Sequence, residues 1–176
     1  MKTSISLVGF MGAGKSAVGK ALAARLGKSF VELDSVVERK AEISIPEIFQ
    51  RHGETAFREL EIEAAKEVSG LRNTVLACGG GTVLNRINVD RLRNESVVVY
   101  LKAAPEVLLV RMAGTEGERP VLKACDGESA IKELLKFREP FYDRAADIEV
   151  DTSRLDIGAV VERIVRELRV NESFSL

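Results

Sequence analysis

Long hydrophobic runs are missing from this 176-residue sequence. No stretch approaches the roughly 18 uncharged apolar residues that a membrane-spanning helix requires. The N-terminal segment MKTSISLVGF also has too short an apolar run for a secretory signal peptide. We therefore expect a cytoplasmic protein that makes no contact with a membrane.

Metal-ligating and disulfide-forming side chains are scarce. The chain has two cysteines, Cys78 and Cys125, and one histidine, His52. The cysteines have neither the spacing of a metal-binding pair nor the number that a disulfide framework needs. A single histidine argues against a histidine-based zinc site, and no serine-nucleophile motif accompanies it.

An excess of charge of one sign is absent as well. The sequence carries 26 lysines and arginines against 27 aspartates and glutamates, which gives a formal net charge of −1. This balance provides no general attraction to nucleic acid or to an anionic membrane. An anionic ligand must therefore be held by a few local positive groups, which indicates a small binding site.

Short β-rich segments alternate with helical ones, which is the pattern of a parallel sheet covered by helices. The apolar run at residues 97–101 is typical of a strand buried on both faces. No repeat or linker divides the chain, so we expect one α/β domain over residues 1–176. The predicted strands are residues 5–9, 30–33, 74–78, 97–101 and 147–150.

The predicted helices follow from capping signals and from apolar residues at helical spacing. Ser44-Ile45-Pro46-Glu47 combines a capping serine, an early proline and the glutamate of a capping box. The predicted helices are Lys15–Leu26, one that opens at Ser44, one that follows Gly53, and residues 105–113 and 156–168.

Residues 114–127 break this pattern. The segment is rich in glycine and charge and has neither helical nor strand period. A long irregular segment in a compact domain is usually a functional loop or lid. A surface loop without a role is the alternative.

Residues 9–16, Gly-Phe-Met-Gly-Ala-Gly-Lys-Ser, match the phosphate-binding pattern G-x-x-x-x-G-K-[ST] between an apolar strand and an amphipathic helix. Glycines let backbone N–H groups converge on phosphate oxygens, and the N-terminus of the helix adds partial positive charge. We expect Lys15 to reach the β- and γ-phosphates and Ser16 to place its hydroxyl on Mg²⁺. A glycine-rich turn that binds nothing is the alternative, but the context favours a nucleoside triphosphate site.

The strand predicted at residues 74–78 runs directly into Gly79-Gly80-Gly81. It lacks the metal-binding aspartate of a typical P-loop ATPase, and the chain has no N-K-x-D or T-K-x-D motif of a regulatory GTPase. Three glycines serve the close approach of backbone to a ligand better than they serve packing. A tight turn would need only one or two of them.

An ordered series of motifs resembles the shikimate kinase family, which has the nucleoside-monophosphate-kinase-like P-loop fold. The series covers almost the whole chain, and its combination is far more specific than the P-loop alone. The motifs are GFMGAGKS at 9–16, VELD at 31–34, SIPEIFQRHGETAFRELE at 44–61, CGGGTV at 78–83, ERP at 118–120, REPFYDRAAD at 138–147 and VDTSR at 150–154.

The resemblance implies a three-layer α/β/α fold with a five-stranded parallel sheet, substrate-binding helices at about 35–62 and a mobile lid at about 112–126. It also implies a monomeric enzyme that uses ATP and Mg²⁺ to phosphorylate the 3-hydroxyl of shikimate, in chorismate and aromatic amino acid biosynthesis. Two alternatives stay open. One is a kinase of another small metabolite such as gluconate or a nucleotide, and the other is a non-catalytic relative that binds ATP or shikimate.

For the nucleotide, the resemblance implies a site built from the P-loop and from arginines. Arg119 matches the lid arginine that stabilises charge on the transferred phosphoryl group. Arg111 and Arg154 resemble residues that flank the adenine, with ordinary surface charge as the alternative for both. The residues expected to hold the ATP phosphates are Gly12, Ala13, Gly14, Lys15, Ser16 and Ala17.

For the acceptor, the resemblance gives carboxylate-binding roles to Arg58 and Arg138, since a planar guanidinium pairs with a carboxylate in bidentate geometry. Spacing alone makes Arg58 a surface ion partner of Glu54 and Glu61. Asp34, at the carboxyl edge of the sheet, is expected to accept hydrogen bonds from the substrate hydroxyls and to take the proton. A helix N-cap at residues 35–40 is the alternative for Asp34.

The remaining acceptor contacts implied by the resemblance come from backbone and aromatic groups. Gly79, Gly80 and Gly81 are expected to offer N–H groups to shikimate. Phe49 and Phe57 are expected to wall its ring, although an aromatic residue at helical spacing belongs more often to the core.

Three positions depart from the family pattern. Glu32 stands where an aspartate commonly helps to hold Mg²⁺, often through water. Ala41-Glu42 replaces a more usual glycine-containing pair, and Ala17 stands where threonine often follows the P-loop serine. None of these changes removes a group that the chemistry requires, but the longer Glu32 leaves the geometry of the metal site open.

Overall fold

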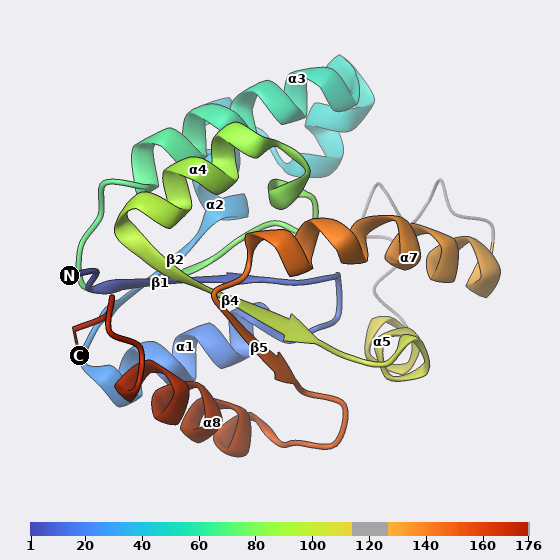
Figure 1. Cartoon of the computed structure of the whole chain (residues 1–176). Coiled ribbons are helices and arrows are strands. Elements are labelled where there is room, and N and C mark those ends of the chain that lie inside the picture. Colours follow the sequence, from blue (N-terminus) through green and yellow to red (C-terminus); the bar gives the residue numbers. More distant parts are fainter. Residues whose placement is uncertain (114–126, 176) are drawn as a thin grey trace.

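Five strands form one sheet in the computed structural model, which describes residues 1–113 and 127–175 (Figure 1). The strands pair in the order β2-β3-β1-β4-β5, and every pair is parallel. The predicted five-stranded parallel sheet is confirmed, with strand ends that differ from the prediction by no more than one residue. The strands are β1 (Ser4–Val8), β2 (Ser29–Glu32), β3 (Thr74–Ala77), β4 (Ser96–Lys102) and β5 (Ile148–Asp151).

Helices cover both faces of the sheet, which confirms the three layers. Figure 1 shows α1 (Lys15–Leu26) and α8 (Ile157–Arg169) on one face and α3 (Ile45–Val68) and α4 (Arg86–Glu95) on the other. Because the central strands are covered twice, all of β1 and β3 and residues 96–101 of β4 are buried. None of the helices within residues 1–113 and 127–175 combines the length and the apolar character needed to cross a bilayer.

The remaining elements lie near the carboxyl ends of the strands. α2 (Leu33–Ala41) follows β2 without a gap, and the 3-10 helix η1 (Thr82–Leu84) follows the glycine triplet. α5 (Pro105–Met112) and α7 (Gly127–Ala145) lie on the side toward which the strand arrows point (Figure 1).

Two helices, α4 and α7, are absent from the sequence prediction. α4 buries only Asn88 and Leu92, so it shows no apolar stripe in the sequence. α7 begins at the end of the irregular segment and contains Pro140, which normally indicates a helix break. By contrast, the predicted inward stripe of α8 is present, with its five residues buried: Val160, Val161, Ile164, Val165 and Leu168.

The departure at Ala41-Glu42 falls at the end of α2. Glu42 adopts the left-handed conformation, with φ of 57°. This position favours glycine because a side chain costs about 1 kcal/mol or more there. The backbone therefore ends α2 in the conformation that a glycine would adopt there, and Glu42 adopts it at the cost of strain.

Gly53 separates the two helices that the sequence predicts within α3. Its φ of 78° and ψ of 177° interrupt an otherwise helical run from Ile45 to Val68. The first part opens with the predicted capping box, in which the Ser44 amide donates to Glu47 at 3.2 Å. The kink therefore sets the direction of the second part, which carries residues of the pocket described below.

We predict that Gly53→Ala lowers the free energy of unfolding by about 1–3 kcal/mol, since this φ/ψ combination is open almost only to glycine. No atom lies within 4 Å of a Cβ built at Gly53, so the cost comes from backbone strain and not from a clash. Gly70→Ala is the matched control, because Gly70 has equal space and no left-handed φ. Urea unfolding of both variants measures the difference, and equal stabilities would contradict the explanation.

Candidate active site

The sheet topology places the carboxyl ends of β1, β2 and β3 side by side at one edge of the sheet. The chain leaves β1, builds β2 and β3 on one side, and then crosses to β4 and β5 on the other. In open parallel sheets, ligands bind beyond the carboxyl ends of the strands at such a switch point. The loops that follow β1, β2 and β3 meet there.

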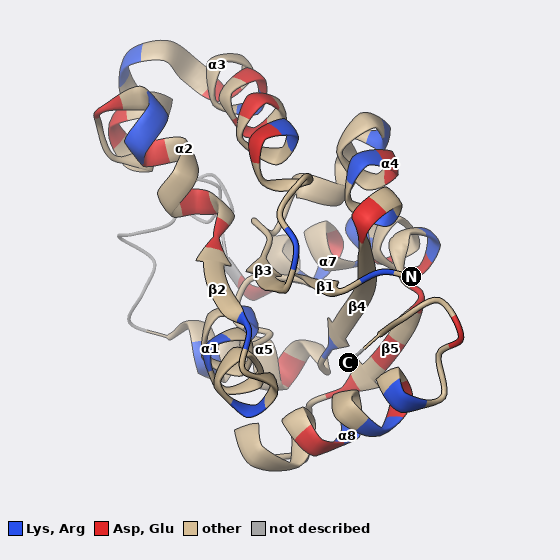
Figure 2. Ribbon diagram, turned by 90° about the vertical axis from the view of Figure 1, so that its left-hand side faces the viewer, with Lys and Arg blue, Asp and Glu red and all other residues tan. Residues whose placement is uncertain are grey.

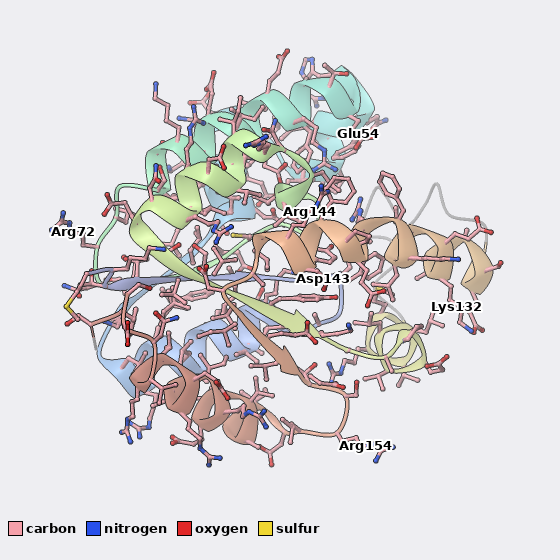
Figure 3. All side chains as sticks on the ribbon, in the orientation of Figure 1. Glu54, Arg72, Lys132, Asp143, Arg144 and Arg154 are labelled. Atoms are coloured by element: carbon pink, nitrogen blue, oxygen red, sulfur yellow. The ribbon has the colours of Figure 1, made fainter. Side chains whose placement is uncertain are left out.

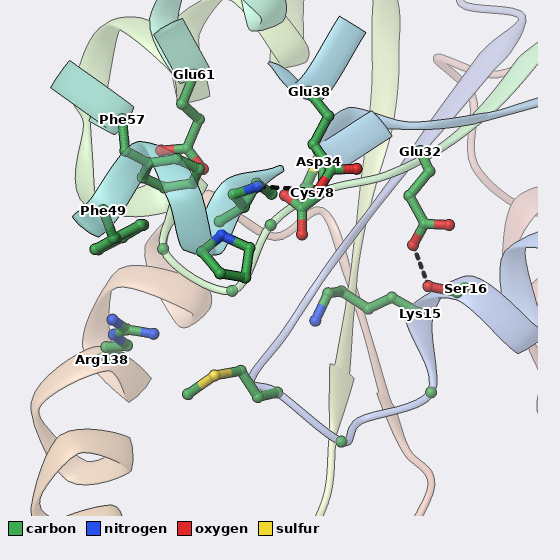
Figure 4. Close-up of a pocket in the computed structure, with 18 of the residues that line it drawn as sticks. Lys15, Ser16, Glu32, Asp34, Glu38, Phe49, Phe57, Glu61, Cys78 and Arg138 are labelled. Carbon is green, nitrogen blue, oxygen red and sulfur yellow. Dashed lines mark hydrogen bonds between the residues drawn. The ribbon is translucent and has the colours of Figure 1, made fainter. Parts of the chain in front are cut away.

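A pocket of about 610 Å³ lies at this end of the sheet (Figure 4). Its wall combines the P-loop (residues 9–16) with α2, α3, the glycine triplet and α7. Most of the site residues predicted from the sequence are gathered here: Gly12, Gly14, Lys15, Ser16, Ala17, Asp34, Arg58, Gly79, Gly80, Gly81 and Arg138.

Two of the predicted residues that the structure describes are not part of this wall. Ala13, within the P-loop, is buried, with an exposed fraction of 2%. Arg154 is exposed on the loop after β5, and Figure 3 shows its side chain pointing away from the body of the protein. Arg119 and most of the predicted lid lie outside the described residues.

The P-loop backbone is fixed by glycines and by α5. Gly12 and Gly14 have φ of 80° and 94°, which residues with a side chain rarely adopt. A Cβ at Gly12 would lie 2.9 Å from Met112 Cγ, so α5 packs directly against the loop. Gly14 is the N-cap of α1, and the N-terminus of this helix therefore faces the position where phosphate binds in such loops.

Lys15 and Ser16 lie along the pocket side of the P-loop. The Lys15 ammonium donates to the carbonyls of Gly9 at 2.8 Å and Phe10 at 2.9 Å. The Ser16 hydroxyl donates to the carboxylate of Glu32, at the end of β2 (Figure 4). Ser16, which is predicted to bind Mg²⁺, is therefore hydrogen-bonded to Glu32, which stands where the family commonly has an aspartate.

Asp34 is the second residue of α2 and faces the same pocket. The N-cap position belongs to Glu32, so the N-cap alternative for Asp34 is wrong. Burial raises the pKa of Asp34 to about 6, against the charge of Lys15, which lowers it. The carboxylates of Glu61, Glu32 and Glu38 add to the increase, and Figure 2 shows acidic residues running from the end of β2 into α2. A carboxylate with this pKa can accept a proton near neutral pH.

The glycine triplet is required by close contacts with side chains of the site. A Cβ at Gly79 would lie 2.9 Å from Asp34 Oδ1 and 3.0 Å from Glu61 Oε1. A Cβ at Gly81 would lie only 2.5 Å from Arg58 Nη1. Larger residues would displace the groups that line the pocket.

Arg58 is both an ion-pair partner and a pocket residue. Its guanidinium donates to Glu54 at 3.0 Å and to Glu61 at 2.9 Å. Glu54 is exposed beside the Gly53 kink of α3 (Figure 3), whereas the side chain of Glu61 is 2% exposed and also accepts from Thr82 at 2.7 Å. The spacing of these residues predicts the ion pairs, but nothing in the spacing indicates that Glu61 is buried in the wall of the site.

Arg138 is the buried cation of the pocket. It is 4% exposed, and its guanidinium lies 5.8 Å from the ring centroid of Phe10. Within the described part of the chain, its Nε has no hydrogen-bond partner. A buried guanidinium on the pocket wall, without a carboxylate partner among the described residues, favours an anionic ligand in the pocket.

Phe49 and Phe57 lie together in the pocket wall. Their rings are 4.9 Å apart between centroids and tilted by 39°. Phe57 also belongs to the buried core. Arg111 lines the pocket too, and its guanidinium donates to Thr152 at the end of β5.

Cys78 lines the pocket but is 3% exposed. Burial raises the pKa of its thiol far above neutral pH. Because the thiolate is the reactive form, Cys78 is a packing residue of the site floor and a poor nucleophile.

The fold and the pocket together define a P-loop kinase that acts on a small molecule. A deoxyadenosine kinase from M. mycoides, 18% identical, shares the fold with a TM-score of 0.63 over 96% of this chain and 100% of that chain. One pocket holds both a phosphate-binding loop and a separate buried cation, Arg138. Such a pocket can accommodate a nucleotide and a second anionic ligand.

The chain belongs to the shikimate kinase family, whose family model matches residues 11–169. It is 47% identical over 163 residues to the shikimate kinase of Caldanaerobacter subterraneus, covering 93% of this chain and 94% of that relative. The shikimate kinase of Geobacter sulfurreducens is 43% identical, over 96% of this chain and 92% of the relative. The family resemblance is confirmed, and the protein is a kinase, an enzyme that uses ATP.

The solved structures agree with this membership. The shikimate kinase from Acinetobacter baumannii in complex with shikimate has a TM-score of 0.92 and 34% identity, over 98% of this chain and 96% of that chain. The shikimate kinase from Aquifex aeolicus gives 0.80 and 32%, with coverage of 94% and 96%.

We predict that Asp34→Asn is more stable than the parent protein at pH 7.5. The folded-state pKa of about 6 lies above the ordinary value of 3.8, so folding takes up a proton between these pH values. The stability of the parent therefore falls as pH rises from about 4 to about 6, by on the order of 2 kcal/mol, and the variant lacks this loss. Thermal unfolding of the parent and the variant at pH 4 and pH 7.5 measures this difference in stability. A variant that is no more stable than the parent at pH 7.5 would contradict the raised pKa of Asp34.

Proposed function

We propose that this protein transfers the γ-phosphoryl group of ATP to the 3-hydroxyl of shikimate, giving ADP and shikimate 3-phosphate in chorismate and aromatic amino acid biosynthesis. The observation that carries the proposal is the buried Arg138 with its unpartnered Nε, in one pocket with the P-loop. A planar cation of this kind fits a carboxylate, and shikimate has one. Figure 4 shows Lys15 and Arg138 on opposite sides of the pocket, which leaves room for two anionic ligands between them.

Shikimate would be oriented by groups at both of its ends. Arg138 and Arg58 bind its carboxylate, and the amides of the glycine triplet, which lines the pocket, add hydrogen bonds. Asp34 accepts hydrogen bonds from the ring hydroxyls, which places the 3-hydroxyl toward the P-loop. Positioning of this kind converts binding energy into rate, because phosphoryl transfer requires the attacking and leaving oxygens to lie in line.

In the transfer step, the 3-hydroxyl oxygen forms a bond to the γ-phosphorus as the bond from that phosphorus to the bridging oxygen of ADP breaks. Asp34 takes the hydroxyl proton, which its raised pKa favours. The P-loop amides and Lys15 bind the phosphate oxygens and stabilise their charge. Arg119 is proposed to add a second positive charge from the lid, in a segment outside the described residues.

The oxygen ligands beside the P-loop fit Mg²⁺. The Ser16 hydroxyl and the Glu32 carboxylate are hard oxygen donors in contact with each other. Residues 1–113 and 127–175 hold no cluster of three acidic, histidine or cysteine side chains that would bind a metal without help. This agrees with a magnesium ion held by one or two protein oxygens and by substrate phosphates. When bound, it would neutralise charge on the phosphates.

We also propose separate roles for two segments of the single domain. Residues 35–62 are proposed as the substrate-binding helices, supported by the positions of Phe49 and Arg58 around the pocket. The proposed lid, residues 112–126, lies almost entirely outside the described residues. A monomeric enzyme that acts on shikimate without nucleic acid or membrane partners, in the cytoplasm, stays our prediction.

A coupled assay of ADP release with Mg-ATP tests the function directly. We expect turnover with shikimate and none with gluconate or a nucleoside monophosphate. Turnover with another acceptor would keep the kinase and reject the substrate. ATP binding without turnover of any acceptor would favour a non-catalytic binding module.

We predict that Arg138→Lys raises the KM for shikimate by about tenfold to a hundredfold and leaves the KM for ATP nearly unchanged. Lysine keeps the charge but loses the bidentate fork, and a hydrogen bond to a charged group contributes about 1.5–3 kcal/mol. Arg144→Lys is the matched control on the same helix, since Arg144 is exposed and, among the described residues, its side chain donates to the Pro140 carbonyl and lies over the Phe141 ring. Steady-state kinetics with each substrate varied decides the question, and an equal increase of both KM values would contradict the role of Arg138.

A further inference from the structure

We propose that Tyr142 is a positioning residue that fixes the Gly80–Gly81 peptide and the Arg138 guanidinium relative to each other. The inference rests on the proposed function, because it concerns the site for the shikimate carboxylate. The tyrosine belongs to the REPFYDRAAD motif at residues 138–147, yet it is absent from the pocket wall. Its side chain is fully buried behind that wall.

The hydroxyl of Tyr142 ties α7 to the glycine triplet. It donates to the carbonyl oxygen of Gly80 across 62 residues of sequence. Burial raises the pKa of Tyr142 to about 12, so the phenol keeps its proton over the whole physiological range. The donor is therefore permanent, and the contact does not depend on pH.

A hydrogen bond at the Gly80 carbonyl orients the next amide. The peptide unit is planar and trans, so the C=O of Gly80 and the N–H of Gly81 point in opposite directions. With the carbonyl held toward buried Tyr142, the Gly81 N–H is directed to the pocket side. Within the described residues, none of the amides of Gly79, Gly80 and Gly81 donates to another group of the protein. Glycine peptides rotate easily, and Tyr142 restrains the one that borders the carboxylate site.

The same phenol contacts Arg138, one helical turn earlier on α7. The charge of the guanidinium lowers the pKa of the phenol against the larger effect of burial. Since the only hydrogen of the phenol is donated to Gly80, its oxygen keeps acceptor capacity toward a neighbouring N–H group. The phenol is therefore bonded to the peptide and lies beside the cation of the site. A Cβ at Gly80 would lie 3.6 Å from Arg138 Nη1, which shows how closely the two parts approach.

Tyr100 provides a matched comparison. Its ring stacks on that of Tyr142 at 5.0 Å between centroids and is equally buried, at 2% exposure. Its hydroxyl makes no hydrogen bond to the glycine triplet. Tyr100→Phe and Tyr142→Phe therefore remove the same group from the same interface, and only the second removes the link to Gly80.

The experiment measures kinetics, stability and amide spectra of both variants beside the parent protein. For Tyr142→Phe we expect the KM for shikimate to rise about fivefold to tenfold, with the KM for ATP and kcat within twofold of the parent. For Tyr100→Phe we expect all three constants within twofold. The ¹⁵N–¹H resonances of Gly80 and Gly81, measured without ligand, should shift in Tyr142→Phe and stay in place in Tyr100→Phe.

Each outcome decides the inference. Equal kinetic effects of the two variants, or a loss of kcat and ATP affinity together with the melting temperature, would mean that Tyr142 only supports packing. If the parent protein does not act on shikimate, the proposed function fails, and the spectra still test the positioning role. Unchanged Gly80 and Gly81 resonances in Tyr142→Phe would then overturn it.

Discussion

The parallel run of the five strands is the constraint on which the site depends. Because every strand ends at the same edge of the sheet, the loops after β1, β2 and β3 converge although they are far apart in sequence. Lys15 follows β1, Asp34 follows β2 and Gly79 follows β3, and all three line one pocket. An antiparallel strand at any of these places would send its loop to the opposite edge and divide the site.

The charges that this arrangement brings together are costly to bury. Burial raises the pKa of Asp34, the charge of Lys15 offsets only part of this, and the carboxylate of Glu61 adds to the increase. A fold selected for stability alone would place apolar side chains here. Under the proposed function the charges have a use, because a base with a pKa near neutral and cations that bind an anion act most strongly where little water is present.

Local patterns predict most of the fold, whereas the site depends on contacts that the sequence does not show. The strands and the P-loop follow from short runs such as residues 97–101 and 9–16. The helix α7 was missed because Pro140 and the preceding irregular segment indicate a break, and with it the burial of Arg138 could not be predicted. Glu61 was missed for another reason: its spacing from Arg58 fits a surface pair, and only the contact with Thr82 shows that it is buried. The site assignments therefore came from the family resemblance.

The two arginines of the pocket differ in a way that the resemblance does not indicate. Arg58 already faces two carboxylates, Glu54 and Glu61, so its charge is balanced before any ligand arrives. Arg138 lies beside a neutral phenol and keeps an unmet donor. Under the proposed function, we expect a ligand carboxylate to gain most by binding at Arg138, because at Arg58 it must compete with Glu54, the exposed partner. We therefore expect α7 to supply most of the affinity for the acceptor, and the pairing of Arg58 with buried Glu61 mainly to fix the orientation of Arg58.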